Sequence, residues 1–342
     1  MRNMRVLFSS NKNPHFETFT EYIEKAFKEN GCETLFFENR DFILPGRIRD
    51  RASFLNKWDL WRLNKRLLAI ARSYKPDLFL EAGGWNILPA TLDAMRDMGI
   101  RTALWTIDPP RIFKPIREAA PYYDFVFTGG SEAYELLEDL KTKHLHWLPF
   151  ACDPDFHGPV KMSVEEKKKY GCDICFVGSN GALYPQRRGF LESLINFHLG
   201  IWGPGWELLP PQSPLKRFIR GGATRPEEWV KIFSASKIVF HSHYHDPSGK
   251  IPCYQAAPRV YEALACEAFL VVDRQPDVLR LFSPSEDLEV FNDVNELREL
   301  VTHYLRHPKE AARIAKRGRK RVLNNHTYRH RIKEILAQLA RD

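Results

Sequence analysis

The residues best suited to chemistry lie in one stretch, Pro258 to Asp273, which reads PRVYEALACEAFLVVD. A helical pattern there runs directly into an apolar strand. Arg259 and Glu262 are three residues apart, so on a helix they share a face near its first turn. A helix start attracts phosphate, an arginine adds bidentate phosphate recognition, and a carboxylate one turn later can accept hydrogen bonds from a ribose diol. The pattern suits a nucleotide diphosphate, and an ordinary helix cap with surface charges is the alternative.

Two glycine-containing loops have the composition of further binding elements. Gly178 and Ser179 follow an apolar strand and precede a helix, so their N–H groups can surround a phosphate. Gly222 and Thr224 belong to a loop before the helix that Pro226 begins, and glycines there permit positive φ and close approach to a flat ring. Taken alone, a tight turn and a flexible connection explain the two loops equally well.

Two side chains in the first half of the chain are candidates for a general base. Asp108 stands at the carboxyl end of an apolar strand, the edge where ligands of open α/β sheets gather. Its carboxylate could deprotonate an acceptor hydroxyl in an inverting reaction, or it could cap the following helix. His15, just after the first strand, is the second candidate.

Length and composition indicate a globular protein of two domains. The chain has 342 residues, of which 44% are hydrophobic and 27% charged. It contains no apolar run of the eighteen or so residues that a membrane span requires, and its start lacks a signal peptide's apolar region. We therefore expect a cytoplasmic protein.

The net charge of +8 is concentrated late in the chain. A solvated helix face explains this charge, and attraction to an anionic partner (a phosphorylated acceptor, nucleic acid or a membrane surface) is the sharper alternative. The basic residues concerned are Arg313, Lys316, Arg317, Arg319, Lys320, Arg321, Arg329, Arg331 and Lys333.

Strand and helix signals alternate along the chain, as in parallel α/β sheets. The first strand is followed by Ser9–Asn13 rather than G-x-G-x-x-G, which disfavours a dinucleotide-binding first domain. Strands are expected at about 5–8, 34–37, 77–81, 102–107, 125–128, 174–177, 199–202, 237–241 and 268–273. Helices are expected at about 16–28, 57–73, 88–97, 132–140, 227–234, 260–265, 294–304, 309–323 and 329–339, the second with Trp58, Trp61, Leu68 and Ala71 along one stripe.

The second half of the chain resembles a known group of enzymes. The stretch around Arg259 and Glu262 looks like the donor-site helix of GT-B glycosyltransferases, and the region from Cys172 onwards is similar to their CgeB (spore maturation protein) group, within the glycosyl transferases group 1 family. Two positions depart from the pattern: Glu267 replaces the usual glycine, and Tyr254 stands where many relatives carry a second, sugar-contacting glutamate. The matching motifs are Phe176-Val177-Gly178-Ser179, Tyr184-Pro185-Gln186-Arg187-Arg188, Gly203-Pro204-Gly205-Trp206, Arg259-Val260-Tyr261-Glu262-Ala263 and His326-Thr327-Tyr328.

The resemblance implies a GT-B fold: two Rossmann-like domains with parallel sheets facing across a cleft, and a final helix that crosses back to the N-terminal domain. The expected boundaries are 1–150 for the acceptor-side domain, 151–325 for the nucleotide-sugar domain and 326–342 for the last helix. The hinge follows from Leu148–Asp155, whose prolines and aspartates interrupt the periodic pattern.

The resemblance also implies roles for individual residues. Arg259 and the helix start would stabilise the leaving diphosphate, and Glu262 would bind the ribose. Gly178 and Ser179 would form the phosphate loop, with Arg187 or Arg188 as a charge partner. The loop of Gly222 and Thr224 would present backbone groups to the nucleobase.

A metal site is the alternative use of three histidines near the donor helix. His241, His243 and His245 alternate and would share one side of a strand, and Asp246 adds an oxygen ligand. They fall at a strand end, however, and zinc needs a closed ligand set. We interpret them as a polar wall of the donor site and expect neither a metal nor another cofactor, since GT-B enzymes generally stabilise the leaving group with a helix dipole and basic side chains.

Together these observations predict a metal-independent, hexosyltransferase-type enzyme. It would move a sugar from a nucleotide diphosphate donor, most simply a UDP-sugar, to a hydroxyl or amine of an unidentified acceptor, and an anionic acceptor would suit the basic charge. The alternatives are a GT-B-fold sugar-nucleotide epimerase, a glycosyltransferase that modifies DNA, and a non-catalytic nucleic-acid-binding protein.

Overall fold

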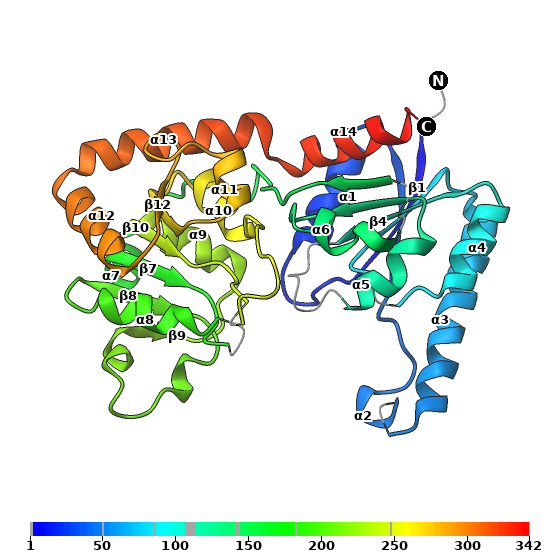
Figure 1. Cartoon of the computed structure of the whole chain (residues 1–342), viewed down its shortest axis with the longest axis horizontal. Helices are drawn as coiled ribbons and strands as arrows, with labels where there is room; N and C mark the ends of the chain where they lie inside the picture. Colours follow the sequence, from blue (N-terminus) through cyan, green and yellow to red (C-terminus); the bar gives the residue numbers. More distant parts are fainter. Residues whose placement is uncertain are drawn as a thin grey trace. The chain divides into compact units, whose positions relative to one another are not determined.

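The computed structural model describes residues 3–49, 51–84, 86–106, 114–140, 142, 144–181, 184–246 and 248–341. The chain forms two compact units. Unit 1 combines Met1–Pro149 with Arg331–Asp342, and unit 2 is Phe150–His330. Each unit has its own six-stranded parallel sheet with helices packed on it (Figure 1).

The sheet of unit 1 has the strand order β2-β1-β3-β4-β5-β6, so the direction in which strands are added reverses between β1 and β3. Its interior strands are mostly apolar and almost entirely buried, as expected for parallel sheets covered on both faces. The strands are β1 (Arg5–Ser10), β2 (Glu33–Glu38), β3 (Leu78–Ala82), β4 (Arg101–Thr106), β5 (Phe125–Thr128) and β6 (His144–Trp147). The helices are α1 (Phe19–Glu29), α2 (Gly46–Arg49), α3 (Ser53–Tyr74), α4 (Pro89–Asp97), α5 (Lys114–Ala119) and α6 (Ala133–Leu136).

Helix α3 corrects one sequence expectation. Its buried stripe is formed by Leu63, Leu67 and Ala71, whereas Trp58 and Trp61 are about half exposed. The expected stripe grouped the tryptophans with Ala71 because all are apolar, but the half of α3 that contains them extends beyond the sheet (Figure 1). No sheet surface is available there to cover them.

Unit 2 has the strand order β12-β11-β10-β7-β8-β9, and the direction of strand addition reverses between β7 and β10. With β7 as its first strand, this is the order 3-2-1-4-5-6 of a Rossmann sheet. The strands are β7 (Cys172–Val177), β8 (Leu199–Trp202), β9 (Ile219–Gly221), β10 (Ser236–His241), β11 (Leu270–Asp273) and β12 (Glu289–Phe291). The helices are α7 (Val164–Tyr170), α8 (Gln186–Ser193), α9 (Pro226–Ala235), α10 (Pro258–Ala265), α11 (Pro276–Leu281), α12 (Val294–Arg306) and α13 (Pro308–Asn325).

The last helix, α14 (Tyr328–Leu339), supplies unit 1 with side chains from the end of the chain. Ile332, Ile335 and Leu339 are fully buried. Two arginines fix the backbone around them: Arg331 donates to the Pro149 carbonyl over 2.7 Å, and Arg101 donates to the Leu339 carbonyl over 2.5 Å. Unit 1 therefore consists of two segments that are far apart in the sequence.

Among the described residues, no helix is both long enough and apolar enough to cross a membrane. The six cysteines are free thiols, including the C-x-x-C pair Cys172 and Cys175 in β7. Burial raises the pKa of the Cys175 thiol, so the buried group is held protonated.

Candidate functional site

The candidate site lies at the carboxyl edge of the unit 2 sheet, at the reversal between β7 and β10. Ligands of open α/β sheets bind at this point because the loops from the two strands diverge there. The loop after β7 begins with Gly178 and Ser179, and the segment after β10 begins with Ser242 and His243. Helix α10 starts at the same edge, since it runs from the β10 loop back to the start of β11.

Arg187 ties the two loops together. Its guanidinium donates to the Ser179 carbonyl and to the Ser242 carbonyl, both over 3.0 Å, and lies 3.3 Å from the centre of the Tyr184 ring. The side chain is buried, and desolvation lowers its pKa to about 10, with Tyr184 opposing the shift. Arg187 thus places a buried positive charge in the site and links the loops after β7 and β10, and both of its terminal nitrogens already have carbonyl partners. Arg188 is exposed and donates to the Asn180 side chain over 2.8 Å.

Asp273, at the end of β11, holds the segment that follows β10. One carboxylate oxygen accepts from the His243 backbone N–H over 2.9 Å and contacts His243 Nδ1 at 2.6 Å, and the other contacts His245 Nε2. Burial alone would raise the pKa of Asp273, but attraction to His243 and hydrogen bonds from His243 and His245 outweigh burial and lower the pKa. The carboxylate therefore stays charged, and it orients two histidines at the edge of the site.

The donor-helix residues form a continuous chain of contacts between α9 and α10. Arg259 Nη1 donates to Glu262 Oε2 over 2.6 Å, and the Arg259 guanidinium lies 3.9 Å from the centre of the Trp229 ring. Trp229 Nε1 in turn donates to Thr224 Oγ1 over 2.7 Å. The structure thus brings together three of the residues expected from the sequence, Thr224, Arg259 and Glu262, with Trp229 as the link between them.

The two glycine loops differ from the sequence reasoning in detail. Gly178 already donates its N–H to the Trp202 carbonyl over 2.9 Å, and its own carbonyl accepts from Trp206 Nε1 over 2.7 Å. Of the two residues, Ser179 is therefore the better candidate to donate a backbone N–H to a phosphate. Gly222 does not adopt the positive φ that a glycine permits, and a Cβ placed on it would meet no atom within 4 Å. The close approach occurs instead at Gly203, whose φ is 136° and whose Cβ would lie 2.1 Å from the Gly178 carbonyl oxygen.

Of the two candidate general bases, the structure describes only His15. His15 is exposed in the loop after β1, where its backbone N–H donates to Asn13 Oδ1 over 2.9 Å. Asp108 lies outside the described residues, as does Ile107, the expected end of its strand. Both assignments stay predictions.

The part of the chain that the structure describes contains no group of three side chains able to hold a metal ion. His243 and His245 are directed to Asp273, and Asp246 accepts from Lys250 N and Ile251 N over 2.9 and 3.1 Å. The buried His241 packs edge-on against His243, with ring centroids 4.9 Å apart, and burial lowers its pKa. The histidines thus form a polar wall around Asp273 rather than a ligand set.

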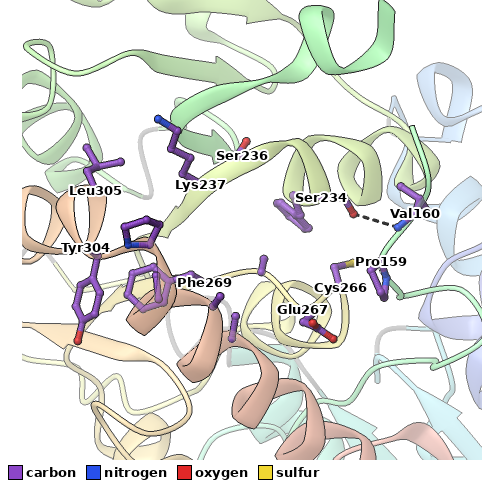
Figure 2. Close-up of a pocket in the computed structure, with 16 residues that line it drawn as sticks. Pro159, Val160, Ser234, Ser236, Lys237, Cys266, Glu267, Phe269, Tyr304 and Leu305 are labelled. Carbon is purple, nitrogen blue, oxygen red and sulfur yellow. Dashed lines mark hydrogen bonds between the residues drawn. The ribbon is translucent and has the colours of Figure 1, made fainter. Parts of the chain in front are cut away.

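A cavity of about 350 Å³ lies at the opposite, amino-terminal edge of the same sheet (Figure 2). Ser236 and Lys237 line it from the start of β10, Phe269 lies just before β11, and Val160 donates to Ser234 Oγ across its rim. This edge is remote from the carboxyl ends, so the cavity is separate from the candidate site.

The comparisons with known proteins agree with this geometry. Residues 186–337 match a family described as glycosyl transferase-like. Sucrose-phosphate synthase from Thermosynechococcus elongatus is 12% identical, with 98% of this chain and 99% of that chain covered and a TM-score of 0.69. HepE from Anabaena, in complex with UDP and glucose, is 12% identical over 99% of this chain and 100% of that chain, with a TM-score of 0.66. A glycosyltransferase from Rickettsia africae is 12% identical over 98% of each chain, with a TM-score of 0.68. No curated protein matches the sequence.

Two Rossmann-type units with the candidate site at the reversal point of the second sheet define the GT-B class, and the predicted fold is confirmed. Within that fold class, residues 186–337 match the glycosyl transferase-like family. The narrower resemblance to the CgeB group stays a prediction.

The sequence analysis did not identify Trp229 or Asp273 as site residues. Asp273 could have been found from the sequence, because it ends an apolar strand of a parallel sheet, the position expected for Asp108. Nothing in the sequence pointed to Trp229, since its role depends on how α9 packs beside α10.

Proposed function

We propose that this protein is a glycosyltransferase that moves a hexosyl group from a UDP-sugar to a hydroxyl or amine of the acceptor without a metal ion. The observation that carries the proposal is the contact chain from Thr224 through Trp229 and Arg259 to Glu262 at the carboxyl edge of the unit 2 sheet. HepE, which has the same fold, is described in complex with UDP-glucose, and this supports a uridine nucleotide here.

Arg259 and Glu262 bind each other in the protein without donor. In the proposed complex the Arg259 guanidinium turns to the diphosphate while Trp229 continues to support its face, and Glu262 accepts from the ribose diol. Ser179 approaches a phosphate oxygen, and the Gly222–Thr224 loop approaches the base. Arg259 then has the diphosphate as its charged partner, and the Glu262 carboxylate accepts hydrogen bonds from the neutral ribose hydroxyls, so both side chains keep polar partners.

In the transfer step, a lone pair on the acceptor oxygen or nitrogen forms a bond to the anomeric carbon. The bond from that carbon to the phosphate oxygen breaks, and the nucleotide diphosphate leaves with the electron pair. The acceptor proton passes to a general base, for which His15 and Asp108 are the candidates. Arg259, the α10 start and the buried charge of Arg187 supply positive potential for the leaving group, which is the basis for proposing metal independence.

The test is a thermal-shift panel of UDP, GDP, CDP, TDP and their sugar conjugates on the wild type, Glu262→Ala and Glu227→Ala. Glu227 is an exposed glutamate in the first turn of α9 and serves as the matched control. We expect UDP and UDP-sugars to raise Tm in the wild type and the control, and the shift to disappear in Glu262→Ala, by ligand linkage. An equal shift in all three proteins, or none at millimolar ligand, would refute the donor site.

A second assay addresses the acceptor requirement. Free UDP released only when an acceptor fraction is present supports transfer, whereas conversion of the sugar nucleotide with no acceptor identifies an epimerase. We also propose that the protein acts in the cytoplasm, as expected from the sequence.

A further inference from the structure

Unit 1 carries an exposed apolar face that the proposed sugar transfer does not use. We define the α2–α3 arm as residues 43–66, which comprise α2, the first part of α3 and their flanking turns. Phe54 is 70% exposed, Ile43 61% and Trp61 52%. Ile48 and Trp58 are exposed beside them. Single exposed apolar residues are ordinary, but five on one short arm mark an interaction surface.

Helical spacing aligns the aromatic residues of the arm. Phe54, Trp58 and Trp61 follow the spacing i, i+4, i+7, so they form one stripe on α3, and Lys65 continues it with its ammonium 5.0 Å from the centre of the Trp61 ring. The buried residues Leu63 and Leu67 lie outside this stripe and pack into the unit 1 core. All three aromatic side chains are about half exposed or more, so the stripe faces solvent.

The arm and the residues just before it are also basic. Residues 40–66 contain eight Lys or Arg and three Asp. Two of the three acids are already neutralised: Asp59 is buried and paired with Arg62 at 3.2 Å, and Asp41 is paired with Arg66. Among the described residues Arg47, Arg51, Lys57 and Lys65 are exposed without an ion pair, so the arm presents uncompensated positive charge.

A pocket beside the arm extends this charge inward. It has a volume of about 460 Å³ and is lined by Arg40, Arg49, Asn86, Phe42, Leu44 and Gly46. The Arg49 guanidinium lies 3.7 Å from the centre of the Phe42 ring, and its Nε has no partner within the described structure. Two arginines and an amide at the mouth of a partly apolar pocket suit a phosphate that is attached to something apolar.

We propose that the α2–α3 arm docks this protein on an anionic phospholipid surface, with Phe54, Trp58 and Trp61 inserted at the level of the headgroups. Exposed tryptophan and phenylalanine flanked by lysine and arginine are the composition of interfacial helices, and the long basic stems reach from the apolar face up to the phosphates. Arg40 and Arg49 would bind a headgroup phosphate in the pocket. The surface would bring unit 1, the expected acceptor side, to acceptors held at a membrane.

The chemistry of the arm favours lipid over nucleic acid. Aromatic rings can stack on bases, but Ile43 and Ile48 have no comparable role on a nucleic acid, whereas acyl chains accept both kinds of side chain. The stripe also lies on a projecting helix rather than in a groove that could track a phosphodiester backbone.

The experiment is co-sedimentation of the full-length protein with large unilamellar vesicles of phosphatidylcholine alone or with 30 mol% phosphatidylglycerol, at low and high salt. We expect binding to the anionic vesicles that weakens with salt. Trp58→Ala/Trp61→Ala should reduce the partition coefficient at least about tenfold through lost apolar burial. Lys57→Gln/Lys65→Gln should reduce it about fivefold for each lysine.

Matched controls place the same changes elsewhere on the chain. Arg313→Gln/Lys316→Gln removes two exposed charges from α13, and Val164→Ala/Leu208→Ala removes apolar area from two side chains that are 78% and 80% exposed. Both controls should keep wild-type binding. Absence of binding to anionic vesicles, or equal losses in arm and control variants, would overturn the proposal.

Two further outcomes would assign the arm to another partner and thereby overturn the proposal. Single-stranded or duplex DNA binding that disappears in the arm variants, without vesicle binding, would identify a nucleic-acid surface. A dimer in solution that dissociates in Trp58→Ala/Trp61→Ala, again without vesicle binding, would identify a contact between copies of this chain. The nucleotide thermal shift serves as the folding check for every variant, and it is independent of the lipid result.

Discussion

The two parallel sheets share one architecture but differ at the points where their strand order reverses. In unit 2 the reversal is filled with interlocked polar groups: Arg187 joins the β7 and β10 loops, and Asp273 holds two histidines. In unit 1 the loop after β1 is held nearer the surface, where Lys12 donates to Glu38 and Glu24, and His15 in that loop is exposed. Two parallel sheets with different strand orders thus carry one preorganised edge and one more adaptable edge.

This difference matches the demands of the proposed sugar transfer. The same nucleotide diphosphate binds at every turnover, and a rigid site binds it without the entropy cost of ordering the protein each time. Acceptors vary, and exposed loop residues are free to vary with them. Four predictions test whether the contrast is real.

The largest effect is expected at Asp273. Its replacement in Asp273→Ala leaves His243 and His245 without their shared carboxylate and should lower the free energy of unfolding by about 3–5 kcal/mol. Urea unfolding of the variant and the wild type measures this loss of unfolding free energy. The control is Asp173→Ala, which breaks the more exposed pair with Lys237 and should cost at most about 1 kcal/mol. A small loss in Asp273→Ala would mean that the unit 2 edge is not interlocked.

A glycine pair tests the close packing of the same edge. Gly203→Ala places a methyl group against the Gly178 carbonyl at a φ of 136° and should cost about 2–3 kcal/mol of unfolding free energy. Gly222→Ala meets open space and should change stability by less than about 0.5 kcal/mol. Comparable unfolding midpoints for the two variants would contradict the close approach of the β7 and β8 loops.

Acidification should weaken unit 2 through His241. Burial lowers the pKa of His241 in the folded protein, so below its ordinary pKa of about 6.5 the unfolded chain binds a proton that the folded chain does not. Stability contributed by this group is present above that pH and declines as the pH falls, by up to about 1.4 kcal/mol per pH unit. Unfolding titrations from pH 7.5 to 5 should give a shallower pH dependence for His241→Leu than for the wild type. Identical slopes would place the acid sensitivity elsewhere.

The smallest effect is expected at the more adaptable edge of unit 1. His15→Ala removes an exposed side chain and should change the unfolding free energy by less than about 0.5 kcal/mol, with no change in nucleotide binding. Chemical denaturation and the UDP thermal shift measure both quantities. A loss above about 1 kcal/mol would show that the unit 1 loop is as interlocked as its counterpart.

The sequence predicted the interior of the fold well because buried parallel strands are continuous apolar runs. Ile174–Val177 and Leu199–Trp202 were expected as strands and lie within β7 and β8. The strands β6, β9 and β12 were not expected: β6 (HLHW) is half histidine, while β9 and β12 have three residues each. Such short or polar strands are stabilised by pairing partners, which a single sequence does not reveal.

For the helices and the site, too, the sequence predicted what local spacing determines and missed what depends on contacts between elements. The expected helix over 132–140 is broken into α6 and a 3-10 turn at Glu138–Leu140. Arg259, Glu262 and Thr224 were found from local spacing and the family resemblance. Trp229 and the contacts of Asp273 depend on neighbours from other elements, so tertiary packing decides them.

The assembly of unit 1 from two distant segments has a consequence for biosynthesis. Residues 3–149 leave the ribosome early, yet Ile332, Ile335 and Leu339, which belong to the same core, are made last. Domains generally fold as units in the order of their synthesis, but here the first domain to emerge is the last to be completed. A truncation at Pro149 should expose the apolar surface that α14 covers, and a nascent chain at that length is a natural client for a chaperone.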